Sequence, residues 1–268
     1  MTTRIRYTKR MRQIQKLGEV ATSELRRDAL AIAEAGYDAI NTERVVIGKV
    51  QVKDGELRIG DTNYNIAGRK VFYVGVGKCA LSAGKEVEKI LGEAFTAGVV
   101  LDVANISPNS NSKIETIIGT HPLPSEENVT GSRRILEFLA DKKENDLVIF
   151  VISGGGSTLL CLPDAPMTCA NESERFKNLT SKGAPIQDIN TVRKHISRAR
   201  GGALAVAAYP AEVISLIASD VPDNNIELIA SGPTVLDTST VADAQLILAK
   251  YDITASANIK FIETPKEQ

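Results

Sequence analysis

Short apolar runs alternate along the chain with longer segments whose apolar residues recur at helical spacing. The first helical segment is predicted over residues 23–40, and Ser23, a residue type favoured at the N-cap, marks its start. A second helix is predicted over residues 78–95. The predicted strands are short and mostly apolar, and they span residues 70–76, 98–103, 114–119, 146–153 and 212–219. This alternation predicts an α/β fold: a doubly wound, mostly parallel sheet with helices on both faces, as in Rossmann-like domains.

A small β-hairpin is predicted ahead of this sheet. Residues 45–52 and 57–66 indicate its two strands, and Asp54-Gly55 is a dipeptide typical of the tight turn between them. Loops that leave the carboxyl ends of parallel strands gather at one edge of a sheet, where ligands bind. The segments that come after the predicted strands are therefore the candidates for binding.

Composition narrows the class of partner. The 268 residues are 43% hydrophobic and 24% charged, which suits a globular chain of one large domain or two small ones. The formal net charge is −1 and only 4% of the residues are aromatic, so no basic or stacking surface for nucleic acid or an anionic membrane is indicated. The expected partners are small molecules, and binding to nucleic acid or to a membrane is not expected. The charge of any bound anion must be neutralised by residues close to it.

Residues 1–22 are set apart by their charge. Their first 16 residues hold six basic residues and no acidic one, and no apolar segment comes after them that would make a secretory signal. We predict a solvated basic arm over residues 1–22 and one domain over residues 23–268. Cys79, Cys161 and Cys169 suggest neither a disulfide framework nor a zinc site, so a cytoplasmic location is expected.

Residues 75–80 (GVGKCA) come after a predicted strand and open a predicted helix. Lys78 places a positive charge at a helix N-terminus whose dipole is already positive, and a bound anion would resolve that conflict. Gly77 and Lys78 are the candidate phosphate-binding residues of this loop. Two alternatives stay open: Lys78 faces solvent, or the loop is a dinucleotide-binding fingerprint, G-x-G-x-x-A, in which Asp102 would bind the ribose.

A second glycine-rich loop comes after the most apolar of the predicted strands. Three consecutive glycines cost backbone entropy, which is reasonable if a bulky ligand must reach bare N–H groups. Phosphate is the natural candidate, and a tight strand-to-helix turn is the alternative. The candidate residues are Ser153, Gly154, Gly155, Gly156 and Ser157.

Residues 189–197 (INTVRKHIS) form a basic segment with helical spacing. Three of its polar side chains fall on one face, which would suit a carboxylate or a phosphate. A solvated charged face explains the spacing equally well. The candidate binding residues of this segment are Asn190, Arg193, Lys194 and His195.

One acidic residue also comes after a predicted strand. Asp220, in the segment SDVPD, is placed either to hold magnesium beside phosphates or to cap its own loop. The two histidines, His121 and His195, lie far apart in the sequence and do not by themselves indicate a metal site.

Taken together and in order, these segments resemble the glycerate 2-kinase family. The resemblance runs from about Leu25 to Lys250. The matching segments are GVGKCA (75–80), GTHPLP (119–124), SGGGSTLL (153–160), INTVRKHIS (189–197), ARGG (199–202), SDVP (219–222) and IASGPTVLD (229–237). Members of that family transfer the γ-phosphoryl group of ATP to the 2-hydroxyl of glycerate, so the resemblance implies a kinase that uses ATP and Mg²⁺.

The resemblance also implies roles for single residues. Lys78 matches the family's essential lysine and would bind the transferring phosphoryl group, while the N–H groups of residues 154–156 would cradle a phosphate. Arg193 and Asn190 would bind the carboxylate of glycerate, and Asp220 would hold the magnesium ion. Lys78, Arg193 and Asp220 are thus the predicted catalytic residues.

The chain departs from the family pattern in two loops and in length. Ser125 stands directly after HPLP (121–124), where the family usually has Asp. Asn224 and Asn225 stand where the family usually has acidic residues, and residues 238–268 are too few for the family's second, C-terminal domain. We therefore expect that domain to be absent here, with a separately encoded chain as the candidate to supply it. Two other functions fit the sequence: a non-catalytic binding module of the same family, and an NAD-dependent oxidoreductase.

Overall fold

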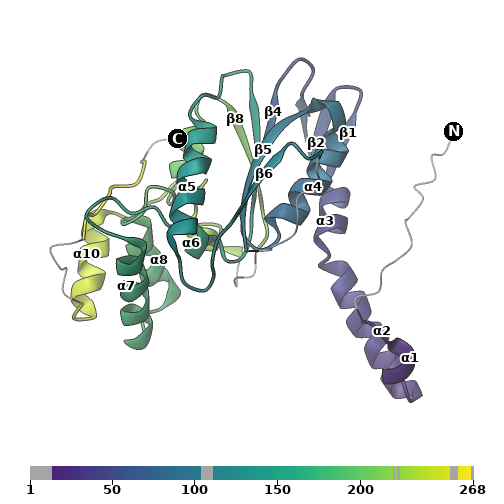
Figure 1. Ribbon diagram of the computed structural model, residues 1–268, viewed down its shortest axis with the longest axis horizontal. Helices are drawn as coiled ribbons and strands as arrows, with labels where there is room; N and C mark the ends of the chain where they lie inside the picture. Colours follow the sequence, from purple (N-terminus) through teal and green to yellow (C-terminus); the bar gives the residue numbers. More distant parts are fainter. Residues whose placement is uncertain (1–13, 104–110, 220, 222–223, 254–258, 267–268) are drawn as a thin grey trace.

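The fold is that of a computed structural model of the chain, which describes residues 14–103, 111–219, 221, 224–253 and 259–266. Asp220 and most of the predicted basic arm lie outside these residues. Figure 1 shows a central sheet with a group of helices at one end and a projecting helical segment at the other.

Five parallel strands form the central sheet, in the spatial order β6-β5-β4-β7-β8. Their bounds are β4 (Val71–Val76), β5 (Phe95–Asp102), β6 (Ile114–Ile118), β7 (Leu147–Ile152) and β8 (Glu212–Ile217). Each predicted strand of the sheet is confirmed to within a few residues. The chain builds outward from β4 to β6 and then returns to the other side of β4 to form β7. The order of strands therefore reverses between β4 and β7, which is the position where open α/β sheets bind ligands.

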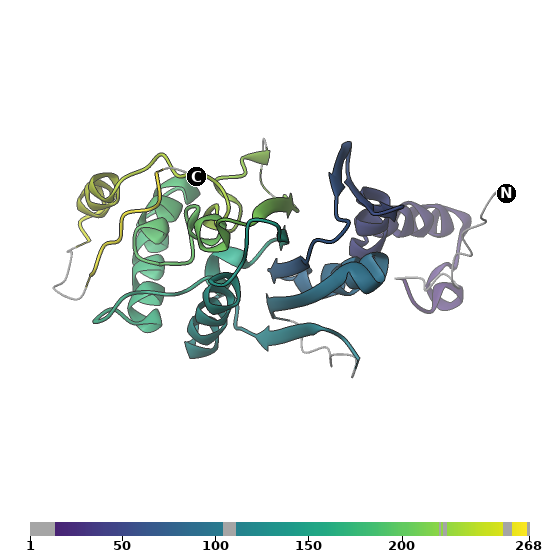
Figure 2. The same ribbon diagram turned by 90° about the horizontal axis from the view of Figure 1, so that it is seen from above.

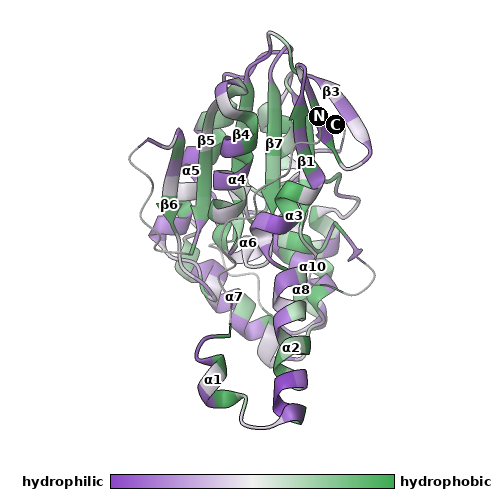
Figure 3. Cartoon of the chain, turned by 90° about the vertical axis from the view of Figure 1, so that its right-hand side faces the viewer, coloured by the Kyte–Doolittle hydropathy of each residue, from purple (hydrophilic) through white to green (hydrophobic). Residues whose placement is uncertain are grey.

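Both faces of the sheet are covered. Val71 and Tyr73 of β4 face the cluster that contains α4 (Ala80–Leu91), whereas Phe72 and Val74 face the cluster that contains α5 (Glu126–Leu139). Figure 2 shows helices on both sides of the strands, and Figure 3 shows β4, β5 and β7 as mostly hydrophobic. β4 and β7 are continuous apolar runs because both of their faces are buried, whereas the edge strands β6 and β8 are only partly buried.

Three further helices pack together beside the sheet. They are α7 (Cys169–Ser181), α8 (Ile186–Lys194) and α10 (Val241–Lys250), and their apolar residues form a cluster of their own. Capping boxes begin α7 at Thr168 and α10 at Thr240. The remaining short helices are η1 (Gly92–Ala94), α6 (Gly156–Leu159), α9 (Ala203–Ala208) and η3 (Ile229–Ser231).

The N-terminal segment differs from its prediction in how it packs. The helix predicted over residues 23–40 is confirmed as α2 (Glu24–Ala39), and the Ser23 hydroxyl accepts a hydrogen bond from the Arg26 N–H. It comes after a short helix, α1 (Leu17–Val20), and projects away from the sheet (Figure 1). Because of that projection its apolar residues Leu25 and Ile32 stay largely exposed.

The predicted hairpin is wrong in its first half. Residues 45–49 belong to a helix, α3 (Thr42–Lys49), because the Asn41 side chain caps its start and Val46 packs into the core. The rest forms a three-stranded antiparallel sheet of β1 (Val50–Lys53), β2 (Glu56–Ile59) and β3 (Thr62–Asn65). The turn at Asp54-Gly55 is confirmed, with positive φ at both residues.

The difference in burial between α5 and α2 predicts a difference in stability. Ile135→Ala in α5 removes a fully buried side chain and is expected to cost about 2–5 kcal/mol of unfolding free energy. Ile32→Ala, the same substitution at a helical side chain that is 75% exposed, is expected to change it by less than about 0.5 kcal/mol. Urea denaturation followed by circular dichroism measures both. Equal losses would contradict the exposed position of α2.

Candidate functional site

The two predicted glycine loops meet at the point where the strand order reverses. The loop after β4 and the loop after β7 are joined by a backbone hydrogen bond from the Lys78 N–H to the Gly154 carbonyl, 3.0 Å long. The Cys79 N–H also donates to the Ser153 hydroxyl at 3.3 Å. The structure thus brings together Lys78 and the triple-glycine loop.

Gly77 is needed for this close contact. Its φ is +118°, and a Cβ added there would lie 2.2 Å from the Ser153 Oγ. Its N–H already donates to the Leu101 carbonyl at 3.1 Å. The prediction that Gly77 binds phosphate is therefore corrected: this residue allows the two loops to approach, and its N–H is occupied.

The glycine loop after β7 keeps part of its backbone open. Gly156 donates to the Ser153 carbonyl, and its missing side chain makes room for Ala230. Within the described part of the chain, the N–H groups of Gly154 and Gly155 have no hydrogen-bond acceptor. Gly155 has a φ of +92°, a conformation that favours glycine. Two neighbouring N–H groups are thus available to an anion.

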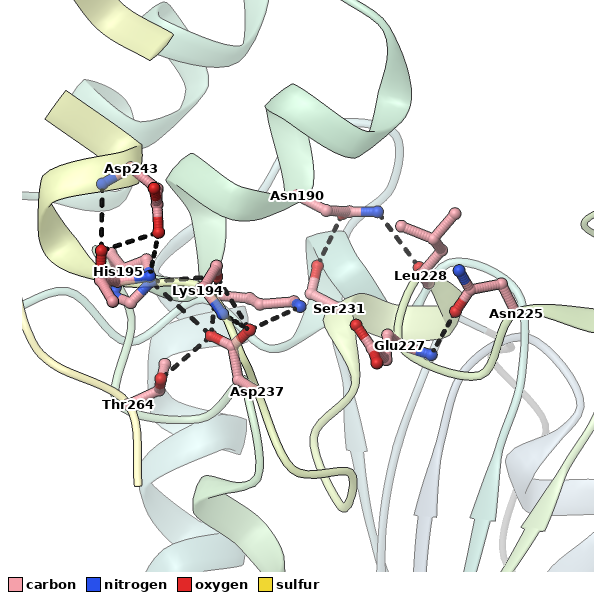
Figure 4. A network of polar contacts seen from close by, with 12 residues as sticks. Asn190, Lys194, His195, Asn225, Glu227, Leu228, Ser231, Asp237, Asp243 and Thr264 are labelled. Atoms are coloured by element: carbon pink, nitrogen blue, oxygen red, sulfur yellow. Dashed lines mark hydrogen bonds and ion pairs between the residues drawn. The ribbon is translucent and has the colours of Figure 1, made fainter. Parts of the chain in front are cut away.

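The two serines of this loop serve internal contacts. The Ser153 hydroxyl accepts from the Cys79 N–H, and the Ser157 hydroxyl lies 3.1 Å from that of Ser231. Ser231 also donates to the Asn190 side-chain oxygen at 2.8 Å, and the Asn190 amide donates to the Leu228 carbonyl at 3.2 Å (Figure 4). Asn190 is buried, and both ends of its amide are bonded within the protein. It therefore fastens α8 to η3, which corrects its predicted contact with a carboxylate.

Lys78 is exposed and lies over the glycine loop. Its Cγ and Cε are each 3.3 Å from the position that a Cβ of Gly155 would occupy, and so is the Cδ2 of His121. No described residue forms an ion pair or hydrogen bond with the Lys78 ammonium group. An uncompensated positive charge therefore stands beside the open N–H groups of the loop.

Arg193, from α8, adds a second positive charge. Only 5% of its surface is exposed, and its guanidinium lies 4.1 Å from the centre of the Phe176 ring. Burial and then the nearby Arg200 charge lower the pKa of Arg193 to about 10, so it stays protonated at neutral pH. Its Nε and Nη2 atoms are buried and have no hydrogen-bond partner. Unsatisfied buried donors are costly, and a bound anion would satisfy them.

Arg200 explains why Arg193 has no counter-charge. The buried carboxylate of Glu172 is taken by Arg200, at 2.5 Å, and Arg200 also donates to the Arg193 carbonyl at 3.1 Å. Glu172 therefore pairs directly with Arg200 and acts on Arg193 only through space. Burial and then the Lys78 charge lower the pKa of His121, and the charge of Arg193 adds to this effect.

Lys194 and His195 lie in a separate network and do not join the glycine loop. The Lys194 ammonium is 3.0 Å from the Asp237 carboxylate, which also accepts from Thr264, and both basic residues are buried (Figure 4). The ring nitrogens of His195 contact the Ile262 carbonyl and the Ser239 hydroxyl. Lys194, one residue and about 100° further round the helix, and His195, the C-cap of α8, reach the C-terminal segment instead of the Phe176 side that Arg193 contacts. In the structure these two side chains anchor the C-terminal segment, and their predicted role in phosphate binding stays a prediction.

Asp237 is the residue that the sequence did not identify. Burial acts to raise the pKa of its carboxyl, but hydrogen bonds from Lys194 and Ser239 outweigh that effect and lower it. Asp237 is therefore ionised and balances the buried charge of Lys194. The only sequence signal was its place at the end of the motif IASGPTVLD.

Asp102 does not suit the dinucleotide alternative. Its carboxylate accepts a hydrogen bond from the Leu81 N–H at 3.0 Å, in the first turn of α4, and it is almost fully buried. A ribose-binding acid must face the ligand. Asp102 instead satisfies a free N–H at the helix start, as a capping residue does.

The predicted metal ligand cannot be placed. Asp220 lies outside the described residues, and the residues that are described include no group of three or more His, Cys, Asp or Glu side chains arranged to hold a metal ion. Because magnesium beside phosphates needs only one or two protein carboxylates, its ligation by Asp220 stays a prediction. Within the same residues, no helix combines the length and the apolar character that crossing a membrane requires.

Known proteins share this architecture. Residues 28–262 match a family model described as a domain of unknown function, DUF4147. The chain is 38% identical over 200 residues to a D-glycerate 2-kinase of Thermotoga maritima, covering 74% of this chain and 48% of the relative. It is 36% identical over 230 residues to a glycerate 2-kinase of Pyrococcus horikoshii, and this match covers 86% of this chain and 51% of the relative.

A crystal structure of glycerate kinase from Thermotoga maritima superposes with a TM-score of 0.76 at 33% identity, over 89% of this chain and 55% of that one. The chain spans about half the length of the curated relatives it matches. The α/β fold and the resemblance carried by the motifs are both confirmed. The chain belongs to the glycerate 2-kinase family.

Proposed function

We propose that this chain binds the phosphate groups in a glycerate 2-kinase reaction, in which the γ-phosphoryl group of ATP passes to the 2-hydroxyl of glycerate and gives 2-phosphoglycerate. Because the chain spans about half of its relatives, the proposal includes a second part, like the one those relatives carry, that completes the active site. A separately encoded C-terminal chain is one candidate source of that part. We also propose a cytoplasmic location, in keeping with three cysteines that are all free.

One observation carries the proposal: Lys78, a positive charge that no described residue pairs with, lies over a loop whose Gly154 and Gly155 N–H groups are open, and a second buried cation, Arg193, is close enough to act on the His121 ring beside the same loop. The Lys78 side chain lies over Gly155, and Arg193 keeps two buried N–H groups unsatisfied. Phosphoryl transfer requires mainly that two anions be held in line and that charge be neutralised as it moves between them. The arrangement suits that task, because its groups are fixed by the fold before any substrate binds.

The roles come from position. Lys78 binds the transferring phosphoryl group, and the N–H groups of Gly154 and Gly155 bind a neighbouring phosphate. Arg193 binds the carboxylate of glycerate, because its planar guanidinium can satisfy two carboxylate oxygens at once. Magnesium would supply further neutralisation of the phosphates, and its ligation by Asp220 stays a prediction.

Lys78→Met is expected to lower kcat by about 10²- to 10³-fold, the loss typical of one preorganised charge-stabilising group. The assay couples the product to enolase, which accepts 2-phosphoglycerate, and uses this chain alone and with the remaining part of a relative. Lys89→Met is the matched control, since Lys89 is an exposed residue of α4, the helix that follows Lys78, and pairs only with Glu86 among the described residues. Equal rates in the two variants would remove Lys78 from the mechanism.

Arg193→Met is expected to weaken glycerate binding by about 10- to 100-fold, as for a lost hydrogen bond to a charged group. It should lower the unfolding free energy by less than about 1 kcal/mol, because it removes a buried charge that no carboxylate balances. Calorimetric titration measures the affinity and urea denaturation the stability.

Arg200→Met is the control for that variant. It leaves the buried Glu172 carboxylate without its partner, and a loss of about 3–5 kcal/mol is expected. If Arg193→Met destabilised the protein as much and left glycerate affinity unchanged, Arg193 would be a structural residue.

A further inference from the structure

His121 lies at the same place as Lys78, yet none of the proposed roles involves it. Its Cδ2 is 3.3 Å from the position that a Cβ of Gly155 would occupy, as are Cγ and Cε of Lys78. The imidazole ring and the lysine stem therefore flank the same glycine. Any phosphate held by this loop and by Lys78 lies next to the ring.

The loop that carries His121 is fixed on both sides of the residue. The fully buried Asn128 of α5 accepts from the Thr120 N–H at 2.7 Å and donates to the carbonyls of Thr120 and Thr158, each at 3.0 Å. The Thr158 hydroxyl donates to the Pro122 carbonyl at 3.3 Å. Thr158 belongs to α6, which begins at the last of the three glycines. His121 is thus held to the phosphate-binding loop through one buried amide.

The surroundings of the ring favour its neutral form. Burial, then the charges of Lys78 from the turn before α4 and Arg193 from α8, lower the pKa of His121 below its ordinary value of about 6.5. No described residue forms a hydrogen bond with either of its ring nitrogens. His195 differs in both burial and bonding, since it is fully buried and both of its nitrogens have partners. His121 therefore offers an unshared lone pair that is free to accept a proton.

Nearby carboxylates are committed elsewhere. Asp102 bonds the start of α4, and Glu172 is paired with Arg200. A general base for the acceptor hydroxyl must lie within hydrogen-bond reach of it, and its pKa should be near or below the working pH. Of the described groups beside the Gly155 turn, the His121 ring meets these requirements.

We propose that His121 is a catalytic residue that accepts the proton of the acceptor hydroxyl during phosphoryl transfer, an inference that rests on the proposed function. The hydroxyl oxygen of glycerate forms a bond to the γ-phosphorus while the bond from that phosphorus to the bridging oxygen breaks, and its electron pair leaves with ADP. The hydroxyl proton moves to a ring nitrogen of His121, which becomes an imidazolium. The proton returns to solvent after the products leave.

The test compares wild-type protein with His121→Gln, since glutamine keeps a polar side chain that accepts no proton at neutral pH. We expect kcat to fall by about 10²- to 10⁴-fold, with KM for ATP changed by less than about threefold. Wild-type kcat/KM should fall as the pH drops below the lowered pKa of His121, because protonation removes the lone pair. The variant should lack this acidic limb, and added imidazole should restore part of its rate.

Proton NMR provides the check on folding. The sequence has only two histidines, so the ring signal lost in His121→Gln identifies His121, and an unchanged His195 signal shows that the fold is intact. In the wild type the His121 signal should titrate below the ordinary histidine value of about 6.5.

The outcomes separate the two proposals. If wild-type protein transfers no phosphoryl group to glycerate, alone or with the remaining part of a relative, the proposed function fails and the role of His121 fails with it. If the wild type is active and His121→Gln retains its rate and its acidic limb, only the role of His121 is overturned.

Discussion

The turn after β4 and the loop after β7 approach each other so closely that no side chain fits between them at Gly77. A Cβ at this position would lie 2.2 Å from the Ser153 hydroxyl oxygen, well inside van der Waals contact. The approach lets the Lys78 N–H reach the Gly154 carbonyl, and that bond fixes where the lysine side chain begins. The proposed phosphate site depends on this contact, because it places the Lys78 side chain, which follows β4, over the open N–H groups of the loop that follows β7. The two loops are neighbours because β4 and β7 lie side by side in the sheet, at the point where the order of the strands reverses.

The second constraint is electrostatic. The chain as a whole carries a formal net charge of only −1, so the positive character of the site is local. It arises because Glu172 compensates Arg200 and leaves Arg193 without a carboxylate. Keeping such a charge buried costs free energy unless a ligand completes its hydrogen bonds. This is the pattern expected of a site whose missing counter-charge is its substrate.

The strands and the loops between them were predictable from the sequence, because buried parallel strands form continuous apolar runs. Residues 45–49 were not, since their run of β-branched residues resembles a strand and only the Asn41 cap and the burial of Val46 make them a helix. Periodicity also could not say which face of residues 189–197 meets the ligand. Arg193 packs over the Phe176 ring, whereas Lys194 turns toward Asp237, a carboxylate 43 residues away in sequence. Such long-range pairs leave no local signal in the sequence.

The proximity of His121 to two cations has opposite consequences before and after substrates bind. In the free protein, burial and then the charges of Lys78 and Arg193 lower its pKa, which favours the unprotonated ring and also makes it a weaker base. A phosphate beside Lys78 and a carboxylate beside Arg193 would offset both charges, and the pKa of the ring would then rise. The imidazolium formed during transfer would in turn be stabilised by the anions that caused this rise. In the proposed mechanism, the positive charges thus keep the His121 ring unprotonated in the empty site, and the ring becomes a stronger base once both anionic substrates are bound.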